Sequence, residues 1–459
     1  MAGKRAAVEI VRTLRERGHQ AYLVGGCVRD LLLGREPADY DVSTDATPDQ
    51  VMRIFPETYA VGAQFGVVLV PAKSVGVDGA PEPGEEPTTE HPKVVEVATF
   101  RSDGAYSDGR HPDAVRYTTD PREDVQRRDF TINGLMLDPL DHDRVLDFVE
   151  GRRDLQRGLI RTIGEAERRF TEDKLRMLRA IRFAARFQYQ IDAQTFDSIR
   201  QLAPRVHQVS RERVRDELTK MLTEGRARRA FELLDETGLL HELLPEIEKM
   251  KGIEQPPQFH PEGDVWVHTL LLLSMLEPGV SKTLAWGALL HDVGKPPTFR
   301  LAPDRIRFDG HVEVGVRMAE EICRRFRMSN DESEQIMSLV ENHMRFGDVE
   351  SMKDSTFKRF VRLPQFEEHL ELHRIDSLSS HAILDLYRYT KDKMANLPPE
   401  EVRPDPLVSG NDLIAAGYRP GPEFKEILSV VEDAQLEGRV HSKQEAMELV
   451  LKHYPKRPA

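Results

Sequence analysis

The sequence is poor in the features that mark secreted and membrane proteins. It has only two cysteines, Cys27 and Cys323, in 459 residues, too few for a disulfide framework or a cysteine-based zinc site. No run approaches the roughly 18 consecutive apolar residues that a membrane-spanning helix needs. The N-terminal segment has an amphipathic helical pattern without the apolar core of a signal peptide. These absences predict a cytoplasmic protein with no membrane partner.

The chain also lacks an excess of positive charge. Its formal net charge is −13, which taken alone disfavours a nucleic-acid partner. The average hides an uneven distribution, because residues 151–230 hold 20 Lys and Arg against 11 Asp and Glu. A basic segment in an acidic chain can bind a polyanion on one face. The same composition is typical of a solvated helical surface, and composition does not decide between the two.

Hydrophobic periodicity divides the chain into a mixed part and a helical part. Residues 1–150 combine helical and strand patterns, with a long Pro-, Gly- and Glu-rich loop at 71–93. Four short strands are expected there: 21–26, 64–70, 94–100 and 144–149. Helical patterns fill the rest in three stretches separated by proline-containing breaks: 151–255, 256–395 and 396–459.

Two aspartates, Asp39 and Asp41, stand one residue apart after the pair Gly25-Gly26. In a strand their carboxylates would share one face and would need a cation between them. Mg²⁺ prefers carboxylate oxygens and often carries phosphate oxygens, so the pattern fits phosphoryl transfer. The glycines would let backbone N–H groups approach a triphosphate, and Arg29 would add positive charge. The alternative is a plain strand-to-helix turn, with Asp39 as a turn residue.

The stretch TEDKLRMLRAIR has the pattern of one helix whose polar stripe contains Glu172, Arg176 and Arg179. Asp173 and Arg182 lie at the two edges of that stripe. A carboxylate that accepts and a guanidinium that donates can pair with the amino group and ring acceptor of C or A. An i, i+3 salt bridge between Asp173 and Arg176 is the simpler interpretation.

Four motifs in order resemble the class II tRNA nucleotidyltransferases, which include CCA-adding enzymes and bacterial poly(A) polymerases. They are LVGGCVRDLLLG…ADYDVST, GAQFGVVLV, RRDFTINGL and DLQRGLIRTIGEAERRFTEDKLRMLRAIRFAARF. The resemblance covers about residues 20–250. It implies an α+β protein with a polymerase-β-like mixed-sheet nucleotidyltransferase head (1–150) and an all-helical neck and body (151–255) that binds the tRNA 3′ end.

The resemblance also implies roles for individual residues. Asp39 and Asp41 would be the catalytic ligands of Mg²⁺. The Glu-Asp-x-x-Arg motif that selects the nucleotide falls on Glu172, Asp173 and Arg176. The full set of implied nucleotide-binding residues is Gly25, Gly26, Arg29, Arg128, Asp173, Arg176, Arg179 and Arg182.

Histidines and aspartates recur at the ends of predicted helices in the third part of the chain. Imidazole and carboxylate ligands together suit a transition metal or Mg²⁺. The motifs HPEGDVWVHTLLLL, ALLHDVGKP, DGHVEVG, VENHMRF and RIDSLSSH resemble the HD-type metal-dependent phosphohydrolases. The alternative is an HD fold that has lost its metal. Residues 256–395 would then form a helical HD domain, and 396–459 a small C-terminal helical module.

The HD resemblance implies ligands for a divalent metal (Mg, Mn, Ni or Co) and hydrolysis of phosphate esters or 2′,3′-cyclic phosphates. Lys295 would touch a phosphate. The implied ligands are His268, His291, Asp292 and Asp376 for a first metal, with His311 and His343 for a second.

The family resemblance implies template-independent addition of C, C and A to tRNA from CTP and ATP. Residues 100–120 resemble the loop that in this family permits the switch from C to A. Ala63 and Gln64 stand where poly(A) polymerases of the group are usually more basic. An A-adding enzyme and a poly(A) polymerase stay open, as does an HD nucleotide hydrolase whose N-terminal half only binds RNA. The sequence does not decide between a monomer and a dimer.

Overall fold

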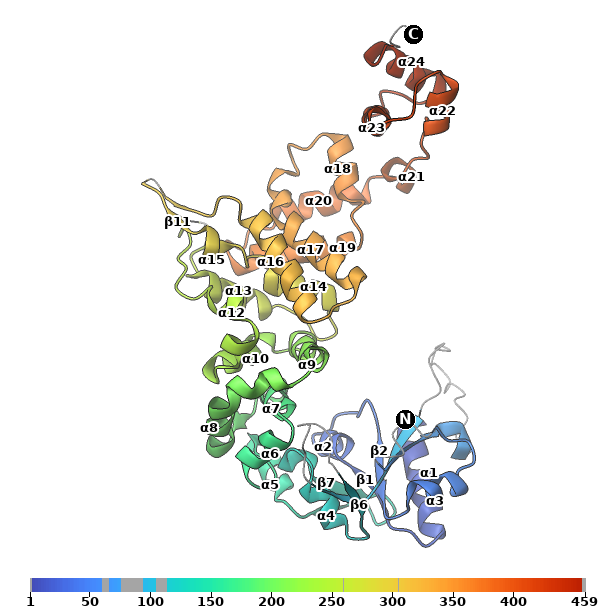
Figure 1. Cartoon of the computed structure of the whole chain (residues 1–459), viewed down its shortest axis with the longest axis vertical. Helices are drawn as coiled ribbons and strands as arrows, with labels where there is room; N and C mark the ends of the chain where they lie inside the picture. Colours follow the sequence, from blue (N-terminus) through green and yellow to red (C-terminus); the bar gives the residue numbers. More distant parts are fainter. Residues whose placement is uncertain are drawn as a thin grey trace. The chain divides into compact units, whose positions relative to one another are not determined.

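The computed structural model describes residues 2–59, 66–75, 94–104, 114–258, 260–303 and 305–455. The chain divides into two compact units, Met1–Pro245 and Glu246–Ala459 (Figure 1). The expected division into four parts stays a prediction; its second boundary, at 255–256, falls inside the second unit. Three expectations lie outside the described residues, in whole or in part: the motif GAQFGVVLV at 62–70 with Ala63 and Gln64, the loop at 71–93, and the loop at 100–120.

The first unit contains a six-stranded mixed sheet in the order β3-β4-β2-β1-β7-β8. Its strands are β1 (Ala21–Val24), β2 (Asp41–Thr44), β3 (Val67–Pro71), β4 (Val94–Thr99), β7 (Leu135–Asp138) and β8 (Arg144–Asp147). Strands β2 and β4 run parallel, and the other neighbours run antiparallel. A separate hairpin joins β5 (Arg101–Asp103) to β6 (Val115–Tyr117). The mixed-sheet head is confirmed; β7 was not predicted.

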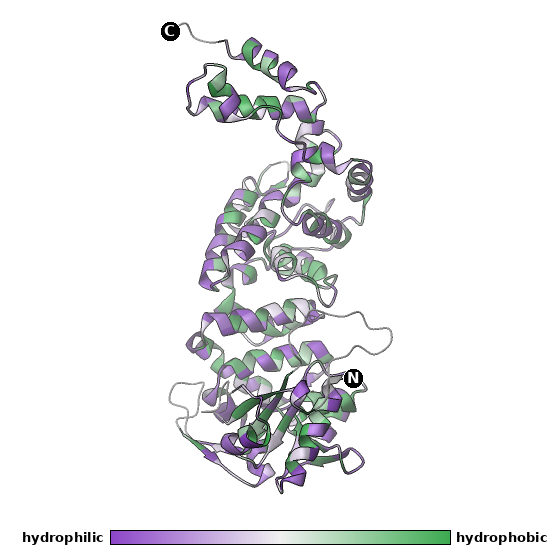
Figure 2. Cartoon of the chain, turned by 90° about the vertical axis from the view of Figure 1, so that its right-hand side faces the viewer, coloured by the Kyte–Doolittle hydropathy of each residue, from purple (hydrophilic) through white to green (hydrophobic). Residues whose placement is uncertain are grey.

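Four helices accompany the sheet: α1 (Ala2–Glu16), α2 (Gly26–Leu32), α3 (Pro48–Ile54) and α4 (Pro121–Gln126). Helix α1 packs on β1, β2 and β4. Its residues Ala6, Ile10 and Leu14 are fully buried, as expected for apolar side chains four residues apart on one helical face. Figure 2 shows this separation of apolar and polar residues: the strands are mainly apolar, and the helices carry both apolar and polar residues.

The helical body follows within the same unit. Its helices are α5 (Gly151–Arg157), α6 (Ala166–Glu172), α7 (Leu175–Phe187), α8 (Ala193–Leu202), α9 (Arg211–Thr223), α10 (Ala227–Glu236) and α11 (Leu239–Leu243), with α12 (Pro245–Glu248) at the boundary. Helix α7 packs against α9 and α10. A short parallel pair of strands, β9 (Leu159–Ile160) and β10 (Gln190–Ile191), departs from the all-helical expectation.

Among its described residues, the second unit has one hairpin, β11 (Arg300–Leu301) and β12 (Ile306–Arg307), and its other regular elements are helices. Its first helices are α13 (Val265–Leu273), α14 (Lys282–Leu290), α15 (Lys295–Thr298), α16 (His311–Arg325), α17 (Asn330–Asn342), α18 (Asp354–Phe360), α19 (Phe366–Ser379) and α20 (Asp385–Ala395). The C-terminal module contains α21 (Pro399–Val402), α22 (Gly410–Ala415), α23 (Glu423–Leu436) and α24 (Lys443–His453). A small apolar core that includes Leu413, Ile427 and Val450 holds this module together.

Gly294 lets the chain that leaves α14 approach α16 closely. A Cβ at this position would lie 2.0 Å from the carbonyl oxygen of His311 and 2.6 Å from the amide nitrogen of Gly315. Both are backbone atoms, so they cannot rotate away as a side chain can. This contact brings His291 and Asp292 next to the first turn of α16.

We therefore expect Gly294→Ala to destabilise the second unit by about 2 kcal/mol or more, as overpacking does. Gly347→Ala is the matched control, because its added Cβ would have nothing within 4 Å, and we expect a change below about 0.5 kcal/mol. Both tryptophans, Trp266 and Trp286, lie in the second unit, so tryptophan fluorescence during denaturant unfolding reports on it. Equal midpoints for the two variants would contradict the prediction.

Candidate active sites

A cavity of about 530 Å³ lies between the head and the body of the first unit. Its lining comes from α2, β2, the segment before β7, α7 and α9. The predicted nucleotide-binding residues all line it: Gly25, Gly26, Arg29, Arg128, Asp173, Arg176, Arg179 and Arg182. Asp41 lines it too, whereas Asp39 does not. Residues 150 positions apart in the sequence therefore meet at one cavity, which we call the nucleotide pocket.

The turn from β1 into α2 needs glycine. Gly25 has φ +75° and ψ −132°, a backbone conformation that side chains with a Cβ rarely adopt. Its N–H donates to the carbonyl oxygen of Leu135 on β7, 3.1 Å away. A Cβ on Gly25 would lie 3.2 Å from Nη1 of Arg128. The glycine thus serves both the turn and the close packing of an arginine in the pocket.

The expectation that Asp39 and Asp41 share one strand is wrong. The β1–β2 ladder ends at the pair Val24 and Asp41, because the turn at Gly25 carries the neighbouring strand away. Strand β2 therefore begins at Asp41, and Asp39 lies in an exposed bend before it.

A third carboxylate, Glu96 on β4, lies beside Asp41 in the parallel register. Burial raises the pKa of Asp41 to about 6, and Glu96 and Asp39 add to the rise while Arg128 opposes it. The three carboxylates thus leave negative charge that a cation would neutralise, and their oxygens are the ligands that Mg²⁺ prefers. The strand VVEVATF was recognised in the sequence, but the register that brings Glu96 to Asp41 could not be read from it.

Arg29 and Arg128 are held in place by hydrogen bonds within the head, and Arg29 also by a ring of the body. Arg29 donates to Oδ1 of Asn133 at 2.7 Å, and its guanidinium lies 4.6 Å from the ring centre of Phe187. Arg128 donates to Oγ of Ser43 at 3.2 Å and to Oδ2 of Asp124 at 3.1 Å. These contacts fix both guanidinium groups at the wall of the nucleotide pocket.

Asp129 connects the head to the body and was missed in the sequence, although it stands in the RRDFTIN motif. Nε of Arg179 donates to its Oδ2 at 2.9 Å, and Nδ2 of Asn133 donates to its Oδ1 at 3.1 Å. Burial would raise the pKa of Asp129, but Arg179 and Asn133 outweigh it and hold the pKa at about 2. The carboxylate therefore stays charged.

The expected single helix over TEDKLRMLRAIR is interrupted. Helix α6 ends at Glu172, Asp173 is extended with φ −146° and ψ 108°, and α7 begins at Leu175. Arg176 bonds to Glu172 at 2.9 Å, whereas Asp173 accepts from Arg213 of α9 at 2.7 Å. The simpler interpretation, an i, i+3 salt bridge between Asp173 and Arg176, is wrong: the structure describes both residues, and they form no such bridge. The break in the helix points the carboxylate of Asp173 toward α9.

Arg182, like Arg29, is a buried arginine of the pocket. Its side chain is 7% exposed, and Nε donates to Oε2 of Glu217 at 2.7 Å. A second carboxylate, that of Glu224, accepts from its Nη1 at 3.2 Å. These partners hold Arg182 against α9 in this structure, and its contact with a nucleotide stays a prediction.

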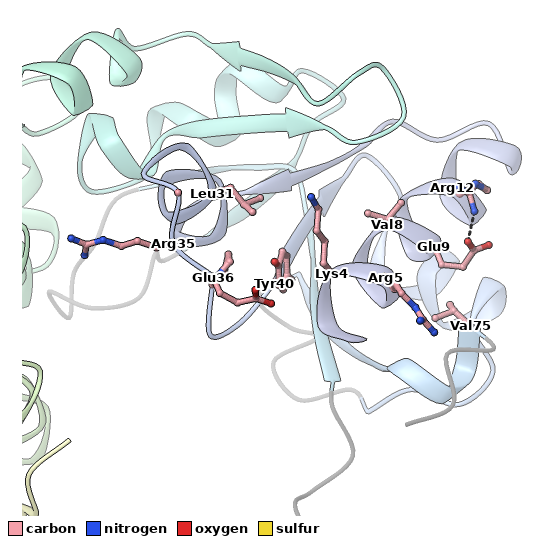
Figure 3. A pocket seen from close by; sticks show the side chains of 12 residues that line it. Lys4, Arg5, Val8, Glu9, Arg12, Leu31, Arg35, Glu36, Tyr40 and Val75 are labelled. Atoms are coloured by element: carbon pink, nitrogen blue, oxygen red, sulfur yellow. Dashed lines mark hydrogen bonds and ion pairs between the residues drawn. The ribbon is translucent and has the colours of Figure 1, made fainter. Parts of the chain in front are cut away.

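A second cavity of the first unit, about 800 Å³ in volume, lies beside α1 and the chain that follows α2 (Figure 3). Tyr40 lines it, whereas the next residue, Asp41, lines the nucleotide pocket. Lys4, Arg12 and Arg35 are among its other lining residues. The two cavities share no lining residue, so neighbouring side chains of one segment serve separate surfaces.

In the second unit, the predicted HD ligands come together. Nε2 of His268 lies 3.1 Å from Oδ1 of Asp376 and 3.3 Å from Nε2 of His291. Nε2 of His291 lies 3.2 Å from Oδ2 of Asp292. The other carboxylate oxygen of Asp292 lies 3.8 Å from Nε2 of His343 and 4.0 Å from Nε2 of His311. Asp292 therefore stands between the two predicted ligand sets, which we call the HD cluster.

The four histidines of the HD cluster all present Nε2 to its centre. Nδ1 of His291, His311 and His343 lies 2.7–3.0 Å from a backbone carbonyl oxygen, which can only accept. Nδ1 of His268 lies 2.8 Å from the carboxylate of Glu262. Each Nδ1 must therefore carry the proton, which leaves the Nε2 lone pair of a neutral ring for a metal. Glu262 was not predicted from the sequence, since only the fold places it against His268.

The HD cluster fits a divalent cation. Nε2 of His311 and Nε2 of His343 are buried and have no hydrogen-bond partner in the described part of the chain. Burial would lower the pKa of His268, but Asp376 and Glu262 raise it to about 9. A proton on the imidazole of His268 would then balance the negative charge of Asp376 and Glu262, and a metal ion can supply that positive charge instead of the proton. Lys295 adds a fixed positive charge, with Nζ 2.7 Å from both Oδ2 of Asp292 and Oε1 of Gln255.

The comparisons with known proteins agree with this arrangement. The poly A polymerase head domain matches residues 21–161, the "Probable RNA and SrmB- binding site of polymerase A" matches 188–251, and the HD domain matches 266–380. The CCA-adding enzyme of Geobacillus sp. (strain WCH70) is 30% identical over 449 residues, which are 97% of this chain and 96% of that protein. The match to the Geobacillus stearothermophilus CCA-adding enzyme, 42% identical, spans 233 residues and about half of each chain.

Solved structures extend the likeness along the whole chain. A crystal structure of the Bacillus stearothermophilus CCA-adding enzyme in complex with CTP has a TM-score of 0.72 at 27% identity and covers 98% of both chains. The fold is thus that of a nucleotidyltransferase with a poly A polymerase head. The full-length relative places the chain more narrowly: it belongs to the CCA-adding enzyme family. No described helix is long and apolar enough to cross a membrane.

His369 of α19, the helix that also carries Asp376, predicts an acid sensitivity of the second unit. Burial lowers its pKa from 6.5 to about 4, with Arg345 adding to the effect. Between pH 6.5 and about 4, His369 binds a proton in the unfolded chain but not in the folded protein. The free energy of unfolding therefore decreases as the pH falls below about 6.5, by at most about 1.4 kcal/mol per pH unit. His369→Gln, whose amide can keep the contact with Ser338, should flatten this loss. The test is tryptophan-monitored unfolding at about pH 7 and about pH 5; the same loss in both proteins would contradict it.

Proposed function

We propose that this chain adds C, C and A, without a nucleic-acid template, to the 3′ end of tRNA, using CTP and ATP. The observation that carries the proposal is the nucleotide pocket, where Asp41 of the head faces the same cavity as Asp173 and Arg176 of the body. One group of residues suits phosphoryl transfer and the other suits recognition of a base. Full-length similarity to CCA-adding enzymes supports the same substrate. We expect the enzyme to act in the cytoplasm.

In this mechanism Asp41 and Asp39, with Glu96 beside them, would hold Mg²⁺. The bound ion would activate the RNA 3′ hydroxyl and stabilise the pyrophosphate that leaves. Arg29 and Arg128 are fixed in the pocket wall, where they would bind the triphosphate. The turn at Gly25 brings backbone close to the same phosphates. The reaction is the attack of the 3′ oxygen on the α-phosphorus, which forms one phosphodiester bond and releases pyrophosphate.

Base choice would fall to the body. The carboxylate of Asp173 accepts from the amino group of C or A, and Arg176 donates to the ring nitrogen beside it. U and G present a carbonyl where C and A present the amino group, so the carboxylate would meet an acceptor and repel them. Only C and A would then be added.

Asp41→Asn keeps the shape of the side chain and removes its charge, so we expect nucleotide addition to fall at least about 100-fold. Asp49→Asn, an exposed carboxylate on α3, is the matched control and should keep wild-type addition. The substrates are a tRNA lacking CCA, a tRNA ending in CC, and an unstructured RNA, each with CTP and ATP, with products sized on a gel.

The pattern of products separates the candidate activities. Three nucleotides on the first tRNA and one on the second would support CCA addition. Addition to the second tRNA alone would identify an A-adding enzyme, and long tails on the unstructured RNA a poly(A) polymerase. Full activity of Asp41→Asn would contradict the assigned catalytic site.

A second activity is favoured by the HD cluster. We propose that the second unit hydrolyses phosphate esters or 2′,3′-cyclic phosphates at a divalent metal held by two ligand sets. A bound metal would supply a hydroxide nucleophile at neutral pH. His268, His291, Asp292 and Asp376 would hold the first metal, and His311 and His343 the second, while Lys295 would hold the substrate phosphate. Mg, Mn, Ni or Co would each suit this mixed nitrogen and oxygen donor set.

The variant His291→Ala/Asp292→Ala should lose bound metal and lose hydrolysis of 2′,3′-cyclic AMP, because it removes two ligands at once. It should keep CCA addition, since its residues lie in the other unit. His441→Ala, an exposed histidine of the second unit, is the control. Metal content is measured by mass spectrometry on the purified proteins. Equal metal content in wild type and double variant would contradict the assignment.

A further inference from the structure

Asp173 has a partner that no sequence motif indicates. It lies on the two-residue joint between α6 and α7, so the rigid geometry of a helix does not orient it. Arg213 comes from α9, 40 positions further along the chain, and its side chain and that of Asp173 both line the nucleotide pocket. Both side chains are largely shielded, at 24% and 15% exposure. The orientation of Asp173 therefore depends on contacts from outside its own motif.

The contact between the two side chains is a two-pronged one. Nη2 of Arg213 donates to Oδ2 of Asp173 at 2.7 Å, and Nη1 donates to Oδ1 at 3.2 Å. The backbone N–H of Leu175 also donates to Oδ1, at 3.0 Å. A planar guanidinium that binds both carboxylate oxygens sets the plane of the carboxylate as well as its position.

These three bonds leave one acceptor site on the carboxylate. An ionised Asp offers about four lone-pair sites, two on each oxygen. Arg213 and Leu175 occupy both sites of Oδ1, and Arg213 occupies one site of Oδ2. The remaining site, on Oδ2, can accept one amino hydrogen of C or A.

Arg176 is held in a comparable way. Its Nη1 donates to Glu172 at 2.9 Å and to the carbonyl oxygen of Arg169 at 3.3 Å. Its Nη2 donates to the carbonyl oxygen of Arg127 at 3.1 Å. A guanidinium has five N–H donors, so among the described residues Nε–H and one Nη2–H are left for a ring acceptor. Donor and acceptor are each reduced to the few sites that a base edge needs.

We propose that Arg213 is a positioning residue for base selection: it fixes the carboxylate of Asp173 so that one acceptor site meets the incoming base. This inference rests on the proposed function, because it presupposes that Asp173 reads the base. Without Arg213 only the N–H of Leu175 would hold the carboxylate, so it could rotate about that bond and present either oxygen. The carboxylate would then discriminate less between the amino group of C or A and the carbonyl of U or G, which a water molecule could bridge to it.

The experiment measures kcat/KM for CTP, ATP, UTP and GTP, together with the Kd of CTP and UTP without RNA. We expect Arg213→Ala to lower the CTP-to-UTP ratio by at least about 10-fold, as misplacement of a recognition group does. Arg213→Lys keeps the charge but cannot form the two-pronged contact, so its CTP-to-UTP ratio should lie between those of the wild type and Arg213→Ala. Arg215→Ala, on the same helix and outside the pocket lining, should keep the wild-type ratio even if it weakens tRNA binding.

The outcomes are distinct. In the background of Asp173→Ala, adding Arg213→Ala should change the ratio no further, because the two residues act through one group. A wild-type ratio in Arg213→Ala, with wild-type melting behaviour, would overturn the inference while leaving CCA addition intact. Faster C addition at an unchanged ratio would also overturn it, since Arg213 would then only block Asp173. A wild-type protein that adds no nucleotide would instead refute the proposed function.

Discussion

The nucleotide pocket depends on one buried carboxylate, that of Asp129, which binds both the head and the body of the first unit. Arg179 of α7 donates to one of its oxygens, and Asn133 donates to the other and accepts from Arg29 of α2. One chain of hydrogen bonds thus runs from α2 of the head to α7 of the body. The positive charge of Arg179 offsets the cost of burying a carboxylate. Loss of either charge would leave the other unpaired, so the pair holds these elements together only while both are present.

The carboxylates of this pocket are of two kinds. Asp129 and Asp173 are each paired with an arginine through two of its nitrogen atoms, so their negative charge is already neutralised. Asp41 is different: burial, with Glu96 beside it, raises its pKa to about 6 although Arg128 opposes the rise. A divalent cation would offset both the burial and the neighbouring negative charge. The pattern of arginine pairing therefore indicates which carboxylate would hold metal and which would orient other groups.

The sequence predicted the mixed sheet, the helical units and most of the pocket residues, because these depend on local periodicity and on motifs that remain contiguous. It also predicted the HD cluster, in which His291, His311 and His343 stand at helix ends whereas His268 and Asp376 lie within α13 and α19. It did not predict Glu96, Glu262 or Arg213. Each of these acts through a partner that only strand register or helix packing brings near. The placement of Asp39 on β2 failed for a related reason, since the end of a strand depends on where its neighbour turns away.

Three consecutive residues, Arg127, Arg128 and Asp129, connect the two walls of the nucleotide pocket. The carbonyl oxygen of Arg127 accepts from Arg176, the side chain of Arg128 packs against Gly25, and the carboxylate of Asp129 binds Arg179. Successive groups of one short segment thus contact α7, the turn at Gly25 and again α7. A shift of this segment would move both walls of the pocket together. If the turn binds the phosphates and α7 reads the base, as proposed, this segment would keep the two sites in register although their residues lie far apart in the sequence.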